Sequence, residues 1–385
     1  MRAAPQARGM DISPPLNRLL LAAILAGTLG ALTALIWLLA PGTSPLATMA
    51  TPPPLVALLG AGPMHGAQLL AALLCLAAAA AARARGTAPR GLLLGGAALA
   101  IVVPGLAFGS MATLSHTGYM VAFTVPVLVV ASAAALIRRG GTARWAVGVP
   151  VLAAIVVGLV AGRTVLGHLA AVLLPALARE LVPLASTALF VGTGAIWTGI
   201  GLLALAGTPA AGRIGEALRR RRRLWTIVAA CGPLPYALAR LTWLTPWPLF
   251  GGEMATADPA TRVWGLALSG GCWLGTLLTI GLIRPWGEVF PRWFPAVGGR
   301  PVPVALAAIP GFTVAALLCF AAVPVVLSGV GTGIGPMRGL ALALVFPCWI
   351  WGPSLALAVA GYVAHRRAAS AGSRPVPAAS ARMAG

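Results

Sequence analysis

Arg240 is the residue whose position most directly suggests chemistry. It lies in the apolar stretch 224–244, which is long enough to span a bilayer, and a charge inside such a span costs about 3 kcal/mol on insertion scales. Two interpretations stay open: Arg240 extends to the outer interface or pairs structurally, with Glu253 or Asp258 as partner, or it binds an anionic or polar group. In the second case, we expect the ligand-binding residues to be Arg240, Tyr236, Trp243 and Trp349.

Proline-rich sequences interrupt two apolar stretches and could open a cavity beside Arg240. The first is C-G-P-L-P-Y at 231–236, and the second is P-C-W-I-W-G-P at 347–353. Proline removes a backbone donor and clashes with the preceding turn, and the freed backbone groups can line a polar cavity. Prolines also simply kink membrane helices, so a cavity between the seventh, eighth and tenth spans and plain kinks are both possible.

The segment 284–295, R-P-W-G-E-V-F-P-R-W-F-P, combines arginine, tryptophan and one carboxylate. Such residues at the inner end of a span anchor a protein at the interface, or they dock a partner. Glu288 can pair with Arg284 or Arg292, although the prolines prevent a regular helix. The residues assigned to loop pairing or partner docking are Arg284, Trp286, Glu288, Arg292 and Trp293.

Metal and cofactor chemistry finds little support in the sequence. His65, His116 and His168 are predicted near helix ends on one side, but their spacings match no metal motif. The five cysteines are dispersed among apolar stretches without CxxC spacing and are typical of packing residues. We therefore predict neither a metal site nor a cofactor.

Standard catalytic motifs are missing from the sequence. Without lysine there can be no P-loop G-x-x-x-x-G-K-[ST], and neither H-E-x-x-H nor G-x-S-x-G occurs. No carboxylate falls in a predicted span, which argues against a carboxylate proton or sodium relay. The prediction is that the chain is not an enzyme.

The composition explains where these residues must be placed. Of 385 residues, 59% are hydrophobic and 9% charged, whereas soluble proteins carry about 25% charged residues. The net charge of +21 comes from arginine clusters between apolar stretches, where arginines meet anionic lipid head groups. We therefore predict a lipid-bilayer partner and no nucleic-acid binding.

The apolar stretches predict an all-α, polytopic transmembrane helix bundle of about ten spans. A cytoplasmic N-terminal segment, 1–18, precedes the transmembrane domain, 19–364, and a disordered cytoplasmic tail, 365–385, follows it. The predicted spans are 19–40, 66–82, 91–114, 119–137, 145–162, 184–206, 224–244, 263–283, 303–326 and 339–363.

The arginines orient this bundle with both termini in the cytoplasm. Most arginines then fall on the inner side, as the positive-inside rule requires; the outer ones are Arg163, Arg179, Arg262 and Arg338. The stretch 163–183 is predicted to be an outer interfacial or re-entrant helix, because counting it as a span would move the Arg213–Arg223 cluster outside. The lysine-free, alanine-rich composition suggests a GC-rich genome and hence a bacterial plasma membrane.

Two segments carry a resemblance to a known group. P-Y-A-L-A-R-L-T-W-L-T-P-W-P at 235–248 and R-P-W-G-E-V-F-P-R-W at 284–293 resemble motifs of uncharacterised multi-pass membrane proteins of actinobacteria. The likeness covers about the C-terminal third of the chain. It implies a location in the membrane and no particular activity.

Three functions remain in competition. The leading prediction is a carrier-like or small-molecule-binding protein with Arg240 facing an anionic or polar group. The alternative is a structural or regulatory protein that docks a cytoplasmic partner through 213–223 and 284–295. The third is an enzyme that modifies lipid at the outer face, which would need Glu253, Asp258 or the histidines.

Overall fold

The computed structural model consists almost entirely of helices. It describes residues 10–48, 52–110, 149–161, 178–257, 259–292, 298–327 and 336–372, and the positions 116, 130, 134, 137, 138, 145, 163 and 175. The one sheet in this described part pairs β1 (Met10–Asp11) with β2 (Thr87–Ala88), antiparallel, with Met10 opposite Ala88. The all-α fold class is confirmed.

Seven helical stretches within the described residues are long and apolar enough to cross a membrane. They are α1 (Pro14–Leu39), α4 (Ala61–Arg85), α5 (Arg90–Phe108), α9 (Leu181–Leu205), the pair α11 (Arg222–Cys231) and α12 (Leu234–Leu241), α15 (Val304–Leu327), and the pair α16 (Pro336–Val345) and α17 (Cys348–Gly372). Each coincides with a predicted span. The length and apolar composition of its helices thus identify the chain as a multi-pass membrane protein.

The other three predicted spans are represented less completely. The span 119–137 lies almost wholly outside the described residues, and the span 145–162 is represented by α7 (Val149–Ala161). The span 263–283 corresponds to α14 (Pro259–Gly281). A total of ten spans therefore stays a prediction, as does the outer helix 163–183, most of which lies outside the described part.

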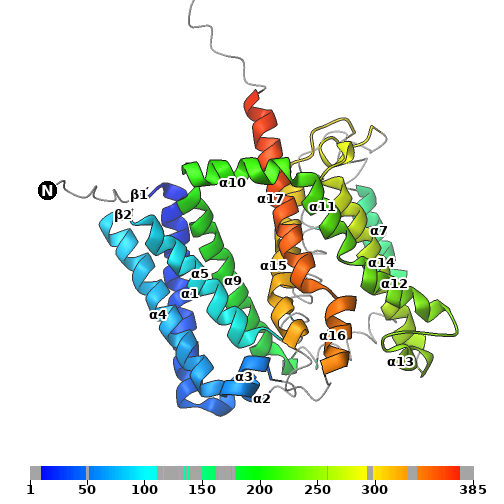
Figure 1. Ribbon diagram of the computed structural model, residues 1–385, viewed down its shortest axis with the longest axis horizontal. Coiled ribbons are helices and arrows are strands. Elements are labelled where there is room, and N and C mark those ends of the chain that lie inside the picture. The colour runs from blue at the N-terminus through cyan, green and yellow to red at the C-terminus, as the bar shows by residue number, and fades with distance from the viewer. Residues whose placement is uncertain are drawn as a thin grey trace, which may run out of the picture. The chain divides into compact units, whose positions relative to one another are not determined.

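The chain divides into two compact units. The first comprises 1–208, 292–298 and 317–344, and its core forms where α1, α4, α5 and α9 pack together (Figure 1). Trp197 of α9 is fully buried there, and its ring covers Gly96 of α5 so closely that a methyl group at Gly96 would overlap it. A small residue at this contact is what allows the two helices to approach.

The two ends of the first bundle have different polar contacts. At one end lie the β1–β2 pair and the hydrogen bond from Arg83 Nε to Asn17 Oδ1, at 2.9 Å. At the other end lie the short helices η1 (Pro41–Thr43), α2 (Pro45–Thr48) and α3 (Pro54–Leu59) (Figure 1). The N-terminal segment and the loop before α5, both predicted to be cytoplasmic, thus meet at one end.

The second unit comprises 209–291, 299–316 and 345–385. The helices α11, α12, α14 and α17 pack here, and α10 (Pro209–Arg220) lies across the end of this group, against α17 (Figure 1). Short turns complete the unit: η3 (Thr242–Leu244), α13 (Gly252–Ala257) and η4 (Pro285–Gly287).

The predicted proline breaks occur, but not at every proline. Helix α11 ends at Cys231 and α12 begins at Leu234, so Gly232 and Pro233 form the break; α16 likewise ends before Pro347. Pro353, in contrast, lies inside α17 without ending it. Helix α17 then continues to Gly372, so 365–372 is helical where the sequence predicted disorder, and 373–385 lie outside the described residues.

Candidate functional site

Arg240 lies at the end of α12 between two aromatic rings. Its guanidinium carbon is 4.0 Å from the centroid of the Trp243 ring and 4.9 Å from that of Tyr236, which is cation–π geometry. Nη1 donates a hydrogen bond to the carbonyl of Phe250, at 3.1 Å. Nε is buried and has no hydrogen-bond partner among the described residues.

The loop after α12 is shaped so that it presents this carbonyl. The indole Nε1 of Trp243 donates to the carbonyl of Leu249 at 2.6 Å, and the amide of Leu249 donates to Thr242 Oγ1 at 2.9 Å. Phe250 and Gly251 then adopt left-handed backbone conformations, with φ of 48° and 80°. Arg240 thus helps to hold a loop that folds back onto its own helix.

The partners of Arg240 differ from those predicted. We expected Glu253 or Asp258, but the described contacts of the guanidinium are a backbone carbonyl and two rings, and none of the described ion pairs joins Arg240 to Glu253. Asp258 lies outside the described residues. The reason is geometric: the tight turn at 249–251 brings the backbone nearer to Arg240 than α13 brings its carboxylate.

The aromatic surroundings of Arg240 extend to α17 through residues that we did not assign to the site. Tyr236 packs edge-on against Phe346 at 5.5 Å between ring centroids, and Phe346 against Trp351 at 5.9 Å. Trp351 also lies over Gly232, where a methyl group would overlap the indole. The predicted Trp349 is 46% exposed in the first turn of α17. Residues two apart face different sides of a helix, and the sequence alone did not show which tryptophan faces α11 and α12.

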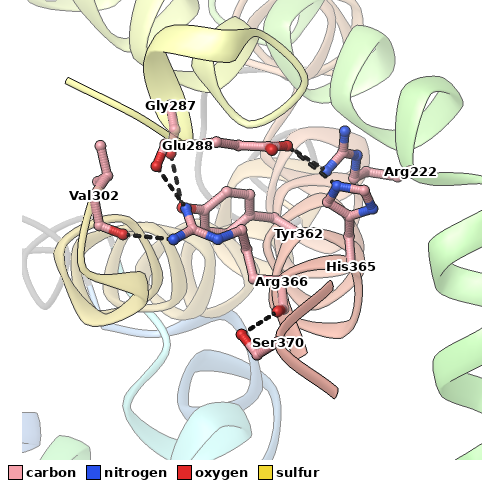
Figure 2. Close-up of polar contacts among 8 residues, drawn as sticks. All are labelled: Arg222, Gly287, Glu288, Val302, Tyr362, His365, Arg366 and Ser370. Carbon is pink, nitrogen blue, oxygen red and sulfur yellow. Dashed lines mark hydrogen bonds and ion pairs between the residues drawn. The ribbon is translucent and has the colours of Figure 1, made fainter. Parts of the chain in front are cut away.

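Glu288 is the centre of a second polar site, the Glu288 cluster, which consists of Arg222, Glu288, Tyr362, His365 and Arg366. Figure 2 shows Arg222 and His365 converging on the Glu288 carboxylate, whose Oε1 is 3.2 Å from both Arg222 Nη1 and His365 Nε2. We predicted Arg284 or Arg292 as partner. The structure instead brings Glu288 to residues distant in sequence, a pairing that local spacing could not reveal.

Backbone contacts fix the loop that carries Glu288 to α17 (Figure 2). Arg366 donates through Nη1 to the carbonyl of Glu288 at 3.2 Å and to the Tyr362 hydroxyl at 2.9 Å, and through Nη2 to the carbonyl of Val302 at 2.9 Å. The Tyr362 hydroxyl donates to the carbonyl of Gly287 at 2.8 Å. Because Tyr362, His365 and Arg366 lie three and four residues apart, they share one face of α17.

The remaining predicted docking residues lie at the surface of this loop. Arg284 and Arg292 are exposed. Trp286 is 36% exposed and covers Gly281, where a methyl group would overlap the ring. Trp293 lies outside the described residues.

The arginine-rich segment 213–223 forms the amphipathic helix α10 and the start of α11. Glu216 accepts hydrogen bonds from Arg219 Nε at 2.8 Å and from Arg220 Nε at 2.7 Å. The Arg219 hydrogen bond, followed by that of Arg220, lowers the pKa of Glu216 from its usual 4.5 to about 2. These groups are exposed to solvent, so they stabilise the fold little.

The described histidines of this set, His65 and His116, have different partners. His65 Nε2 bonds Ser44 Oγ at 2.8 Å, and its ring lies 5.2 Å from that of Trp37. His116 Nε2 lies 3.1 Å from Glu180 Oε2, and His168 falls outside the described residues. Among the residues that the structure describes, no three His, Cys, Asp or Glu side chains form a group that could hold a metal ion.

Comparison of the chain with protein-family models, with curated proteins and with solved structures found no match. The predicted resemblance to actinobacterial membrane proteins therefore stays a prediction. What the sequence and fold establish together is a helical, multi-pass integral membrane protein.

Proposed function

We propose that this protein binds a small anionic or polar molecule at Arg240, as a carrier-like protein of a bacterial plasma membrane. The observation that supports this proposal is the buried Nε of Arg240, which has no hydrogen-bond partner among the described residues. Buried donors in proteins are almost always paired, so a group outside the described chain would satisfy this one.

The chemistry around Arg240 suits an anion. A guanidinium group has five N–H donors, and the Phe250 carbonyl accepts from one nitrogen. Tyr236 and Trp243 flank the group with apolar rings, which lower the local dielectric and strengthen its attraction for a negative charge. A carboxylate or phosphate oxygen is the acceptor that this geometry favours.

The proposal places both termini in the cytoplasm and assumes ten spans. The Glu288 cluster supports one part of this topology, because Arg222, Glu288, Val302 and Arg366 were all assigned to the same, cytoplasmic side and lie together. Arg240 then lies toward the outer face. The proposal includes no catalytic step.

A thermal-shift screen in nanodiscs tests this function. The compounds are carboxylates, phosphates and anionic lipid head groups, applied to wild type and to Arg240→Gln, with Arg284→Gln as a control that removes an exposed arginine from another site. A ligand at a hundredfold excess over its Kd stabilises the folded state by about 2.7 kcal/mol. We expect a class of anion that stabilises wild type and Arg284→Gln but not Arg240→Gln; equal shifts in all three proteins would refute the proposal.

A second function, docking of a cytoplasmic partner through 213–223 and 284–295, is favoured by the described part of the second segment, 284–292. Arg366 and Tyr362 hold its backbone in place, while Arg284 and Arg292 stay exposed. A rigid basic surface of this kind would suit an acidic protein. The same three proteins test this second function. A purified acidic partner protein should bind wild type and Arg240→Gln but should no longer bind Arg284→Gln.

A further inference from the structure

The loop that follows the membrane-span candidate Arg222–Leu244 exposes a group of large apolar side chains. We call the segment 244–250 the apolar loop. Four of its side chains are between 44% and 78% exposed: Leu244, Trp247, Leu249 and Phe250. No charged residue occurs from 241 to 252. An exposed apolar patch of this kind marks a surface that contacts a membrane or another protein.

The backbone of the apolar loop is fixed although its side chains are exposed. The carbonyl of Leu249 accepts a hydrogen bond from the Trp243 indole at 2.6 Å. The carbonyl of Phe250 accepts from Arg240 Nη1 at 3.1 Å. Phe250 also keeps a left-handed backbone conformation, with φ of 48°, which is uncommon for a bulky residue. The loop is therefore preformed, and covering its side chains requires little further ordering.

The inner side of the apolar loop packs against neighbouring helices. Trp243 is buried, and its ring lies over Gly265 of α14 so closely that a methyl group at Gly265 would overlap it. Pro248 covers Gly252, the first residue of α13, in the same way. These contacts hold the loop against the second unit while its large apolar side chains stay exposed.

We propose that the apolar loop is an interfacial membrane anchor, which inserts its side chains among the lipids of the leaflet in which the span Arg222–Leu244 ends. Lipid is favoured over a protein partner because the loop continues directly from that span and so begins at the membrane surface. Tryptophan is enriched at this depth, where its apolar ring meets lipid and its N–H finds a polar partner. The uncharged sequence from 241 to 252 brings no charge whose burial would oppose insertion. The anchor needs no anion at Arg240 and does not depend on the function proposed there.

A fluorescent amino acid in place of Trp247 reports what surrounds the apolar loop. The full chain is reconstituted in nanodiscs whose lipids carry brominated acyl chains, which quench a fluorophore that contacts them, and iodide is added as a quencher from the water. Thr256 of α13 is the control position, because it is exposed in the same unit and lies beyond the uncharged segment. We expect brominated lipids to remove most of the fluorescence at position 247, and iodide to remove most of that at position 256.

The natural tryptophan provides a second measurement. The difference in emission between wild type and Trp247→Phe, recorded in plain and in brominated lipids, gives the lipid quenching of Trp247 itself. This variant should keep the fold, because the hydrogen bond from Trp247 to Thr245 Oγ1 comes from the backbone amide. Strong iodide quenching at position 247 would overturn the proposal by placing the loop in water. Protection from both quenchers would also overturn it, because protein, such as a second copy of the chain, would then cover the loop.

Discussion

Replacing Tyr362 with phenylalanine removes only one oxygen atom, yet it should destabilise the second unit. Tyr362 is fully buried, its hydroxyl donates to the carbonyl of Gly287 at 2.8 Å, and it accepts from Arg366 at 2.9 Å. A neutral hydrogen bond contributes about 1 kcal/mol and one to a charged group about 1.5–3 kcal/mol. Because Arg366 keeps its bonds to Glu288 and Val302, we place the loss at roughly 2–3 kcal/mol.

The assay is reversible unfolding of the full chain in mixed micelles, followed by circular dichroism. Tyr236→Phe is the matched control, because the ring of Tyr236 makes its contacts with Arg240 and Phe346, and phenylalanine keeps that ring. Tyr362→Phe should also be less than additive with Arg366→Met, since both variants remove the same hydrogen bond. A loss below about 0.5 kcal/mol, within the usual range for surface substitutions, would refute the assigned role of this hydroxyl.

Two further outcomes follow from the second unit. Gly232→Ala should destabilise this unit by about 1–3 kcal/mol, because the new methyl group would overlap Trp351. Gly271→Ala is the control: the space around Gly271 is open, so this variant should be neutral or slightly stabilising. Thermal unfolding compares the two variants. Titration of Glu216 by NMR should give a pKa of about 2, and Arg219→Gln with Arg220→Gln should raise it toward 4.5. Since the folded-state pKa is depressed, any stability from Glu216 is present above pH 4.5 and is lost as the pH falls toward 2.

The helices could be predicted from the sequence because each must supply an apolar surface along its whole length. The seven membrane-span candidates of the described residues all coincide with predicted stretches, and the break at Gly232 and Pro233 follows from proline chemistry. The continuation of α17 to Gly372 was missed. Its polar C-terminal end is typical of a disordered tail, but Tyr362, His365 and Arg366 contact the loop, and α10 packs against α17.

The sequence grouped side chains that lie near one another around Arg240, but it did not reveal the partners of Arg240 or of Glu288. Arg240, Tyr236 and Trp243 lie three to seven residues from one another, and helical spacing was enough to group them. The partners of Glu288 lie 66 and 77 positions away in sequence, at Arg222 and His365, where no local pattern points. Gln68 of α4 is buried, and its amide has no hydrogen-bond partner among the described residues; a single amide in an apolar helix has no spacing pattern by which the sequence could single it out.

A binding titration at Arg240 tests the central claim most directly. The stabilising anion found by the screen would be titrated into wild type, Arg240→Lys and Arg240→Gln in nanodiscs, after circular dichroism shows that all three are folded. We predict a Kd at least about tenfold weaker for Arg240→Gln, equivalent to 1.4 kcal/mol, with Arg240→Lys in between because it keeps the charge but not the planar donor group. Equal affinity of the three proteins would contradict the claim and make Arg240 a structural residue that supports the loop at Phe250.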